Sequence, residues 1–122
     1  MTTVNSRASR IRMLVLDVDG VLTDGAVNIA ATGELYKHFN VRDGLGIKML
    51  QKAGIEIAII TGRSSEIVAE RMRELGVTRI AQGQRFKTTA YEALLNDTGL
   101  TAADRERHHP CKQPADLLIL CR

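Results

Sequence analysis

A short apolar run, Met13 to Leu16, leads directly into two aspartates, Asp17 and Asp19, and then into a glycine-containing polar loop. A continuous apolar run without polar alternation is typical of a strand buried on both faces of a parallel sheet. Residues i and i+2 at a strand end point the same way, so the two carboxylates are expected to face one cavity. The run therefore predicts an α/β fold with polar chemistry at one edge of its sheet.

Other segments extend this pattern along the chain. Residues 26–39 roughly alternate apolar and polar side chains around a polar turn, which predicts a projecting β-hairpin. Residues 55–62, "IEIAIITG", form a second apolar strand, and residues 77–83, "VTRIAQG", form a weaker third one. The apolar run at residues 117–120 offers one more strand.

Three helices are expected between and after these strands, with leucine, methionine and valine at helical spacing assigned to the core. Glu92 has capping-box spacing from Thr89 in the last of them. The expected N-caps and closing glycines are, in order, Asp43 and Gly54, Ser64 or Ser65 and Gly76, and Thr89 and Gly99. The alternation predicts one Rossmann-like α/β domain, a doubly wound parallel sheet with right-handed crossovers and no separate cap domain.

Composition excludes several classes of protein. The 122 residues are 44% apolar and 25% charged, as in an ordinary soluble domain. Aromatic residues make up 3%, with no tryptophan, so a stacking platform for single-stranded nucleic acid is not expected. The net charge of +3 is evenly spread, with 13 Lys/Arg against 11 Asp/Glu in residues 1–100 and 4 against 3 thereafter. Nucleic-acid binding is therefore not expected.

The N-terminal segment, the length of the apolar runs and the number of cysteines indicate the cellular compartment of the protein. The N-terminal "MTTVNSRASR" has no apolar segment of the secretory type, and no run approaches the roughly 20 apolar residues that span a bilayer. Two cysteines, Cys111 and Cys121, are too few for a disulfide framework. We therefore expect a cytoplasmic protein without membrane contact.

Polar groups follow all three predicted strands of the core. They are Asp17 and Asp19, then Thr61-Gly62-Arg63, and then residues 82–87, which end in Lys87. Ligands of open parallel sheets bind outside the carboxyl ends of the strands. Two close carboxylates repel unless a cation lies between them or one holds a proton, and Mg²⁺ prefers such oxygen ligands. The pattern predicts a site for an anion beside Mg²⁺, with one carboxylate as nucleophile and the other as acid/base.

The motifs "LDVDGVLTDG" and "IITGR", with Lys87, resemble those of the haloacid dehalogenase superfamily of phosphotransferases. More narrowly, "DVDGVLTDG", "GELYKHFNVRDGLGIKML", "IAIITGR" and "QGQRFK" resemble the family of 3-deoxy-D-manno-octulosonate 8-phosphate (KDO-8-phosphate) phosphatases of lipopolysaccharide biosynthesis. The resemblance covers about residues 10–100. It implies a Mg²⁺-dependent phosphoric monoester hydrolase and a homotetramer assembled by packing hairpins together.

The resemblance also implies residue roles. Asp17 would attack phosphorus, and Asp19 would protonate the leaving alcohol and then activate water, while its backbone carbonyl binds Mg²⁺ beside Asp17. Thr61 would hydrogen-bond a phosphoryl oxygen, and Lys87 would neutralise the phosphate and the nucleophile. The implied substrate-binding set is Asp19, Asn40, Val41, Arg42, Asp43, Gly44, Lys48, Gly62, Arg63, Arg71 and Lys87. Lys48 stands where the family more often has arginine, and lysine offers a point charge instead of a fork.

The chain departs from the family near residue 103. The family continues with a strand and a fourth motif, "GDD" followed by another acid, which adds a Mg²⁺ carboxylate; this sequence has none. We expect residues 1–9 to be a disordered N-terminal segment, residues 10–100 the phosphatase core and residues 101–122 a divergent tail that resembles a truncated or frame-shifted end. The expected results are an uncovered sheet edge and weakened Mg²⁺ binding. Asp116 precedes the last apolar run, which places it at the wrong end of a parallel strand.

Several alternatives stay open. The substrate is KDO-8-phosphate or a related nonulosonate 9-phosphate, and the other class of function is a non-catalytic, receiver-like phosphate-binding domain. Receivers usually carry the accepting aspartate after a later strand, and none follows the second or third strand here. A zinc site at His108, His109, Cys111 and Cys121 matches no standard spacing. Arg71 has an alternative role in pairing with Glu66 or Glu74, and Asp24 is expected to stabilise its turn.

Overall fold

The computed structural model describes residue 9, residues 11–98 and residues 117–120. Its main sheet has four strands in the order β5-β4-β1-β6, and every neighbouring pair is parallel. Leu16 lies opposite Ile59 and Leu120, so the central strands end at the same edge. The strands are β1 (Met13–Leu16), β4 (Glu56–Ile60), β5 (Arg79–Ala81) and β6 (Leu117–Leu120). The predicted parallel α/β fold is confirmed.

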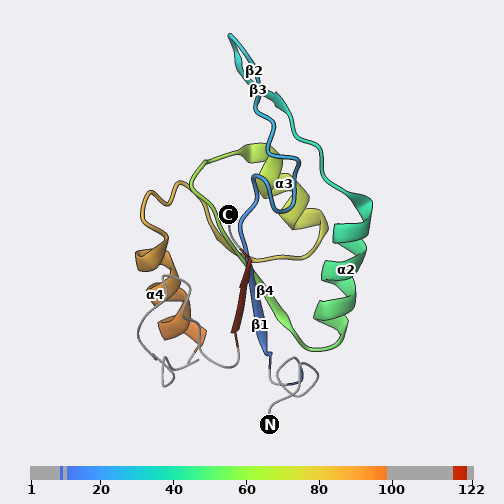
Figure 1. Ribbon diagram of the computed structural model, residues 1–122, viewed down its shortest axis with the longest axis vertical. Helices are drawn as coiled ribbons and strands as arrows, with labels where there is room; N and C mark the ends of the chain where they lie inside the picture. Colours follow the sequence, from blue (N-terminus) through green and yellow to red (C-terminus); the bar gives the residue numbers. More distant parts are fainter. Residues whose placement is uncertain (1–8, 10, 99–116, 121–122) are drawn as a thin grey trace.

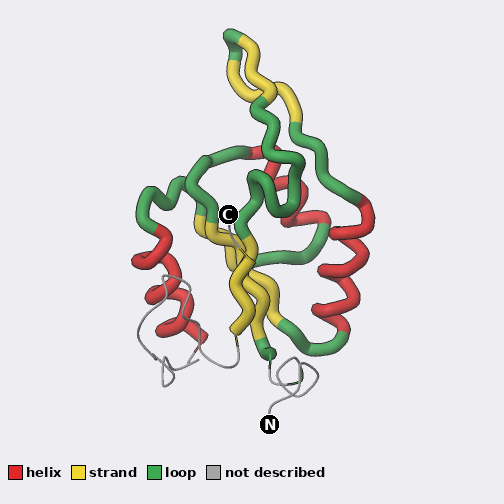
Figure 2. Tube along the Cα trace, in the orientation of Figure 1, coloured by secondary structure: helices red, strands yellow, loops and turns green. Residues whose placement is uncertain are grey.

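Helices cover both faces of this sheet, as Figures 1 and 2 show. The helices are α2 (Val41–Lys52), α3 (Glu66–Glu74) and α4 (Lys87–Thr98). Side chains of a strand alternate between its two faces, and β1 is buried on both. Leu14 and Leu16 pack in one cluster with Met72 of α3, whereas Met13 and Val15 pack in another with residues of α4. The uninterrupted apolar run of β1 therefore follows from its place in the middle layer.

A β-hairpin projects beyond the carboxyl edge of the sheet (Figure 1). Its strands are β2 (Asn28–Ala30) and β3 (Gly33–Tyr36), which pair antiparallel around a tight turn. Thr23 and Phe39 form an isolated antiparallel bridge at its base. The hairpin predicted in residues 26–39 is confirmed.

The helix starts differ in part from prediction. The N-cap of α2 is Asn40, whose side chain accepts a hydrogen bond from the Arg42 backbone N–H at 2.8 Å. The prediction of Asp43 as cap was wrong: it lies in the first turn, where a carboxylate also suits the helix dipole. Thr89 is likewise inside α4, which begins at Lys87. The predicted cap of α3 is confirmed as Ser65.

The earlier start of α2 also changes which of its residues reach the core. Its buried residues are Gly44 and Ile47, while Leu45 and Met49 are each 63% exposed. Their assignment to the core was therefore wrong. They lie in an i, i+4 row that begins at Val41, on the side of the helix away from the sheet.

Strand β6 confirms the additional strand expected from the apolar run at residues 117–120. It pairs with β1 in parallel along all four of its residues. Leu117, its first residue, lies opposite Met13 at the amino edge of the sheet. The predictions for residues 1–8, Gly99, Asp116 and the candidate zinc ligands lie outside the described residues. Within the part that is described, no helix has the length and apolarity to cross a bilayer.

Candidate active site

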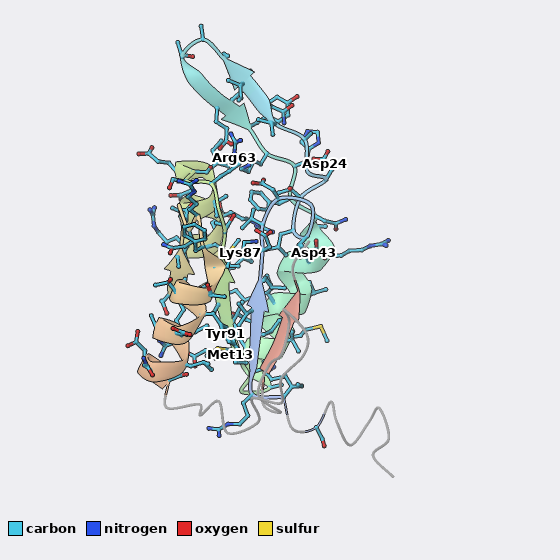
Figure 3. All side chains as sticks on the ribbon, turned by 60° about the vertical axis from the view of Figure 1, so that its left-hand side comes forward. Met13, Asp24, Asp43, Arg63, Lys87 and Tyr91 are labelled. Carbon is cyan, nitrogen blue, oxygen red and sulfur yellow. The ribbon has the colours of Figure 1, made fainter. Side chains whose placement is uncertain are left out.

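Asp17 follows the last residue of β1, and both of its carboxylate oxygens are fixed. Oδ1 accepts a hydrogen bond from the Val18 backbone N–H at 2.7 Å, and Oδ2 accepts one from Lys87 Nζ at 2.7 Å. Asp17 is buried, whereas the lysine side chain is 39% exposed. In Figure 3, Lys87 lies near the carboxyl end of β1, far along the strand from Met13. The fold thus joins residues 70 positions apart into a charge-assisted pair at the sheet edge.

Thr61 occupies the equivalent position after β4. Its backbone N–H donates to the Ala81 carbonyl at 2.9 Å, and its own carbonyl accepts from the Gln84 N–H at 3.1 Å. The residue is buried, and Gly62 and Arg63 follow it in an exposed loop. The Arg63 carbonyl accepts a hydrogen bond from the Gly83 N–H at 3.4 Å. The loops after β4 and β5 are therefore linked beside Asp17, as parallel strand ends require.

A tight loop carries Asp19. The Val18 carbonyl accepts hydrogen bonds from the N–H groups of Val21, Leu22 and Thr23 at 2.8–3.2 Å. Thr23 Oγ1 accepts from the Gly20 and Gly25 N–H groups at 3.3 and 3.2 Å. These bonds fix the backbone on both sides of Asp19. Asp24 Oδ1 accepts from the Ala26 N–H at 3.0 Å, which confirms the predicted turn role.

The structure brings the hairpin to this loop through side chains that the sequence analysis missed. Lys37 Nζ donates to Asp19 Oδ1 at 2.8 Å and lies 3.2 Å from Glu34 Oε2. The Ser65 hydroxyl donates to Glu34 Oε1, and the Ser65 N–H donates to Gln82 Oε1 at 2.8 Å. We call these five residues the Lys37 network. The signal in the sequence was a glutamate and a lysine with i, i+3 spacing at the end of a hairpin.

Burial and charge act against each other in this network. Burial lowers the pKa of Lys37, but its hydrogen bonds to Asp19 and Glu34 outweigh burial, so the pKa is raised overall. The hydrogen bond from Ser65 lowers the pKa of Glu34; burial opposes this effect, and Lys37 adds to the lowering. Both shifts favour the charged forms, so Lys37 and Glu34 form an ion pair at neutral pH.

A second cluster contains four of the eleven predicted substrate-binding residues. Asn40, Asp43, Gly44 and Arg71 line one small pocket together with Phe39. The guanidinium of Arg71 lies 5.8 Å from the Phe39 ring centroid, and Nη1 donates to Glu74 Oε2 at 3.1 Å. Its Nε is buried and has no hydrogen-bond partner within the described residues. The predicted pair of Arg71 with Glu74 is therefore present, and the Arg71 Nε–H remains as a donor that no described residue accepts from.

Other members of that predicted set lie elsewhere. Val41 and Arg42 are exposed in the first turn of α2. Lys48 Nζ lies near Gly76, 3.3 Å from where a Cβ would stand at the end of α3. No hydrogen bond or ion pair within the described residues joins these three side chains, or Arg71, to Asp17 or Asp19. Their substrate role stays a prediction.

The donor set at the β1 end fits Mg²⁺. Asp17 and Asp19 offer hard oxygen atoms from one edge, and Mg²⁺ is usually held by one or two carboxylates with waters completing its shell. In the described part of the chain, no three His, Cys, Asp or Glu side chains form a group able to hold a metal.

Relatives of known identity match this chain in sequence, although no family model does. KDO-8-phosphate phosphatase from Escherichia coli strain K12 is 49% identical over 92 residues, which are 75% of this chain and 49% of the relative. The same enzyme from Yersinia pestis is 48% identical over 92 residues, with the same two shares. The chain thus spans about half the length of the curated relatives that it matches.

Solved structures match the fold. KDO-8-phosphate phosphatase from Yersinia pestis has a TM-score of 0.78 and 40% identity, covering 93% of this chain and 55% of that one. The enzyme from Moraxella catarrhalis, solved with magnesium, phosphate and KDO, has a TM-score of 0.74 and 44% identity, covering 78% and 55%. By sequence and by fold, the chain is similar to the KDO-8-phosphate phosphatases and has the fold of the haloacid dehalogenase superfamily, and it is about half as long as these relatives.

Proposed function

We propose that this chain hydrolyses a sugar-acid phosphate, specifically KDO-8-phosphate, with Mg²⁺ as cofactor. The carrying observation is the Asp17 carboxylate, fixed at both oxygens by Val18 and Lys87 at the carboxyl end of β1. Asp19 and Thr61 stand at the same edge. The names of the relatives, and the magnesium, phosphate and KDO of the Moraxella catarrhalis structure, support the substrate and the metal.

In the first step, an Asp17 oxygen attacks phosphorus and an aspartyl-phosphate forms. The bond from phosphorus to the sugar oxygen breaks, its electron pair stays on that oxygen, and Asp19 supplies the proton that makes it an alcohol. Lys87 offsets the negative charge of the nucleophile and the phosphoryl group. The Thr61 hydroxyl donates a hydrogen bond to a phosphoryl oxygen. Because Asp17 is already immobilised, little reorientation is needed before attack.

In the second step, water attacks the phosphorus of the aspartyl-phosphate. Asp19 takes the proton from that water, the bond from phosphorus to Asp17 breaks, and phosphate leaves. The Asp17 carboxylate and the Asp19 backbone carbonyl would hold Mg²⁺. Once bound, Mg²⁺ supplies positive charge that stabilises the phosphoryl oxygens.

The proposed substrate surface lies at the start of α2 and beside α3. The Nε of Arg71, which is buried and has no hydrogen-bond partner among the described residues, supports a role in binding an acidic or hydroxyl group of the sugar acid. Asn40, Val41, Arg42, Asp43, Gly44, Gly62, Arg63 and Lys48 complete the proposed set. Because these residues would select among sugar acids, the identity of the substrate is tested with a panel of sugar phosphates.

The test measures phosphate release with Mg²⁺ from KDO-8-phosphate, a nine-carbon acid phosphate and a hexose 6-phosphate. We expect the eight-carbon acid to give the highest kcat/KM and Asp17→Asn to abolish turnover. A preference for the nine-carbon acid would move the assignment to a nonulosonate phosphatase. A stable aspartyl-phosphate formed from a small phosphodonor, without turnover of any sugar phosphate, would instead support the receiver-like alternative.

Turnover by this chain is expected to be impaired. The "GDD" motif is absent from the printed sequence, and β6, which pairs with β1, is followed by Cys121 instead of an acid. Losing a carboxylate is expected to weaken Mg²⁺ binding by roughly 10- to 100-fold, on the scale of lost outer-shell partners. The measurement compares Mg²⁺ affinity and turnover with those of a variant carrying a restored "GDD" after this strand. Equal values for the two would contradict the proposed impairment.

A cytoplasmic location and a tetramer built from hairpins belong to the same proposal. Four apolar side chains of the hairpin region, Val27, Ile29, Leu35 and Tyr36, are about half exposed or more. Such a patch is costly in water and favours burial against another copy. A neighbour's hairpin would also exclude water from the open strand-end site.

A further inference from the structure

Lys37 and Asp19 lie on different elements, yet they are in direct contact. Lys37 directly follows β3, and Asp19 lies in the loop after β1. The lysine side chain is only 2% exposed, while that of Asp19 is 24% exposed. An ammonium group is rarely buried to this extent without paired charges. The chain therefore holds Lys37 beside Asp19 at a cost that its ion pairs must offset.

Other contacts of the Lys37 network hold the lysine in place. Lys37 Nζ lies 3.2 Å from Glu34 Oε2, and the Ser65 hydroxyl donates a hydrogen bond to Glu34. Ser65 is also the N-cap of α3, where its hydroxyl accepts from the Val68 N–H at 3.3 Å. The lysine is thus connected through Glu34 and Ser65 to the start of α3. A residue held in this way can hold another in place.

The contact engages only one oxygen of Asp19. Oδ1 accepts the hydrogen bond from Lys37, and within the described residues Oδ2 accepts none. The carboxylate is therefore oriented by one oxygen while the other is available for proton transfer. As Asp19 gives its proton to the leaving oxygen, negative charge develops on the carboxylate, and the ammonium is already in place to stabilise it.

We propose that Lys37 is a positioning residue for the proposed hydrolysis, acting by orienting Asp19 as the proton donor to the leaving alcohol. This inference rests on the proposed function. The alternative is a purely structural link that holds the hairpin against the strand-end loops. The two differ in one respect: only a positioning role depends on how much protonation the leaving group needs.

The experiment compares kcat/KM for KDO-8-phosphate and for p-nitrophenyl phosphate. An alkoxide must be protonated as it leaves, whereas p-nitrophenolate is stable without a proton. For Lys37→Met we expect kcat/KM with KDO-8-phosphate to fall by about 10- to 100-fold, a part of the 10²–10⁴ that acid/base catalysis contributes. With p-nitrophenyl phosphate it should fall by less than about threefold on the same reasoning. Lys37→Arg, which keeps the charge, should recover part of the loss.

Lys52→Met is the matched control, because Lys52 is an exposed lysine in the last turn of α2. It should leave both substrates unaffected. Equal losses of kcat/KM on both substrates for Lys37→Met would overturn the positioning role and leave a structural link. A chain without activity on any phosphate would overturn the proposed function and the positioning role with it.

A second measurement tests the contact without any activity. Urea midpoints are compared for Lys37→Met, Asp19→Asn and the double variant. If the side chains interact, the double variant should shift the midpoint by less than the sum of the two single shifts. Additive shifts would show that the two do not interact and would overturn the proposal even in an active enzyme.

Discussion

At the scale of single residues, the site depends on where two lysines are held. Lys87 contacts Asp17 from the start of α4, and Lys37 contacts Asp19 from the hairpin. The first lysine is partly exposed and the second is buried. Exposed pairs contribute little to stability, whereas removing one partner of a buried pair is costly. The two substitutions should therefore affect the protein in different ways.

Lys87→Met should reduce activity while leaving the protein folded. We expect kcat to fall by about 10²-fold or more, because a preorganised cation at the developing charge is lost. The pair is half-buried, since Lys87 is 39% exposed but Asp17 is buried, so the urea-unfolding free energy should fall by about 1–3 kcal/mol. Steady-state kinetics and urea unfolding check this expectation. A loss of activity that follows a comparable loss of folded protein would contradict it.

Glu34 predicts a pH dependence of stability. Its pKa is lowered in the folded state, first by the Ser65 hydrogen bond, so its contribution is present above its ordinary value of 4.5. The contribution is lost as pH falls through the lowered pKa of the folded state. Glu34→Gln should therefore cost about 1–3 kcal/mol at pH 7, as for a hydrogen bond to a charged group.

Urea unfolding at pH 7 and at successively lower pH values gives the measurement. The difference between wild type and Glu34→Gln should shrink as the medium becomes more acidic than pH 4.5. Glu70→Gln is the control, because the Glu70–Arg73 pair is exposed at both ends. A constant Glu34→Gln difference at every pH would argue against the charged hydrogen bond as its source.

At the scale of elements, α2 is held against α3 by a close approach at one glycine. A Cβ at Gly44 would stand 2.5 Å from Arg71 Nη2 and 3.3 Å from Leu75 Cδ2. Gly46, two residues further along the same helix, has nothing within 4 Å of its Cβ position. Substituting alanine at Gly44 and at Gly46 therefore distinguishes two effects. Both substitutions add the helix preference of alanine, but only the one at Gly44 displaces the Arg71 side chain.

Gly46→Ala should stabilise the protein by about 0.5–1 kcal/mol, the usual gain of alanine over glycine inside a helix. Gly44→Ala should not show this gain, because the guanidinium would have to leave Phe39 and Glu74. In an Arg71→Ala background the gain at position 44 should return. Urea unfolding midpoints of the single and double variants measure these changes in stability. An equal gain in stability at both glycines in the wild-type background would contradict the packing argument.

At the scale of the whole molecule, the apolar surface of the hairpin predicts assembly. Ile29 is 60% exposed on an element that projects away from the core (Figure 1). Ile29→Asp should lower the oligomeric mass, since a buried unpaired carboxylate costs several kcal/mol per interface. Light scattering at micromolar concentration measures it, with the exposed Glu70→Asp as control. A wild-type chain that is already monomeric would contradict hairpin assembly.

Local patterns in the sequence determined the strands, the ends of α2 at Gly54 and of α3 at Gly76, and the edge that carries the site. Apolar runs predicted β1, β4 and β6, and Ser65 predicted the start of α3, because periodicity and capping act over a few residues. The start of α2 was missed because Asn40 and Asp43 are both competent near a helix start. The family resemblance, not local pattern, supplied the role of Lys87.

The tertiary structure alone decided which distant side chains meet. Lys37 and Asp19 are 18 residues apart, and Glu34 and Ser65 are 31 apart, on elements whose approach depends on the path of the hairpin. It also decided that β6 lies beside β1 and that Leu45 and Met49 face outward. Local periodicity fixes which side of an element is apolar, but packing of the whole chain selects the neighbours that each side chain contacts.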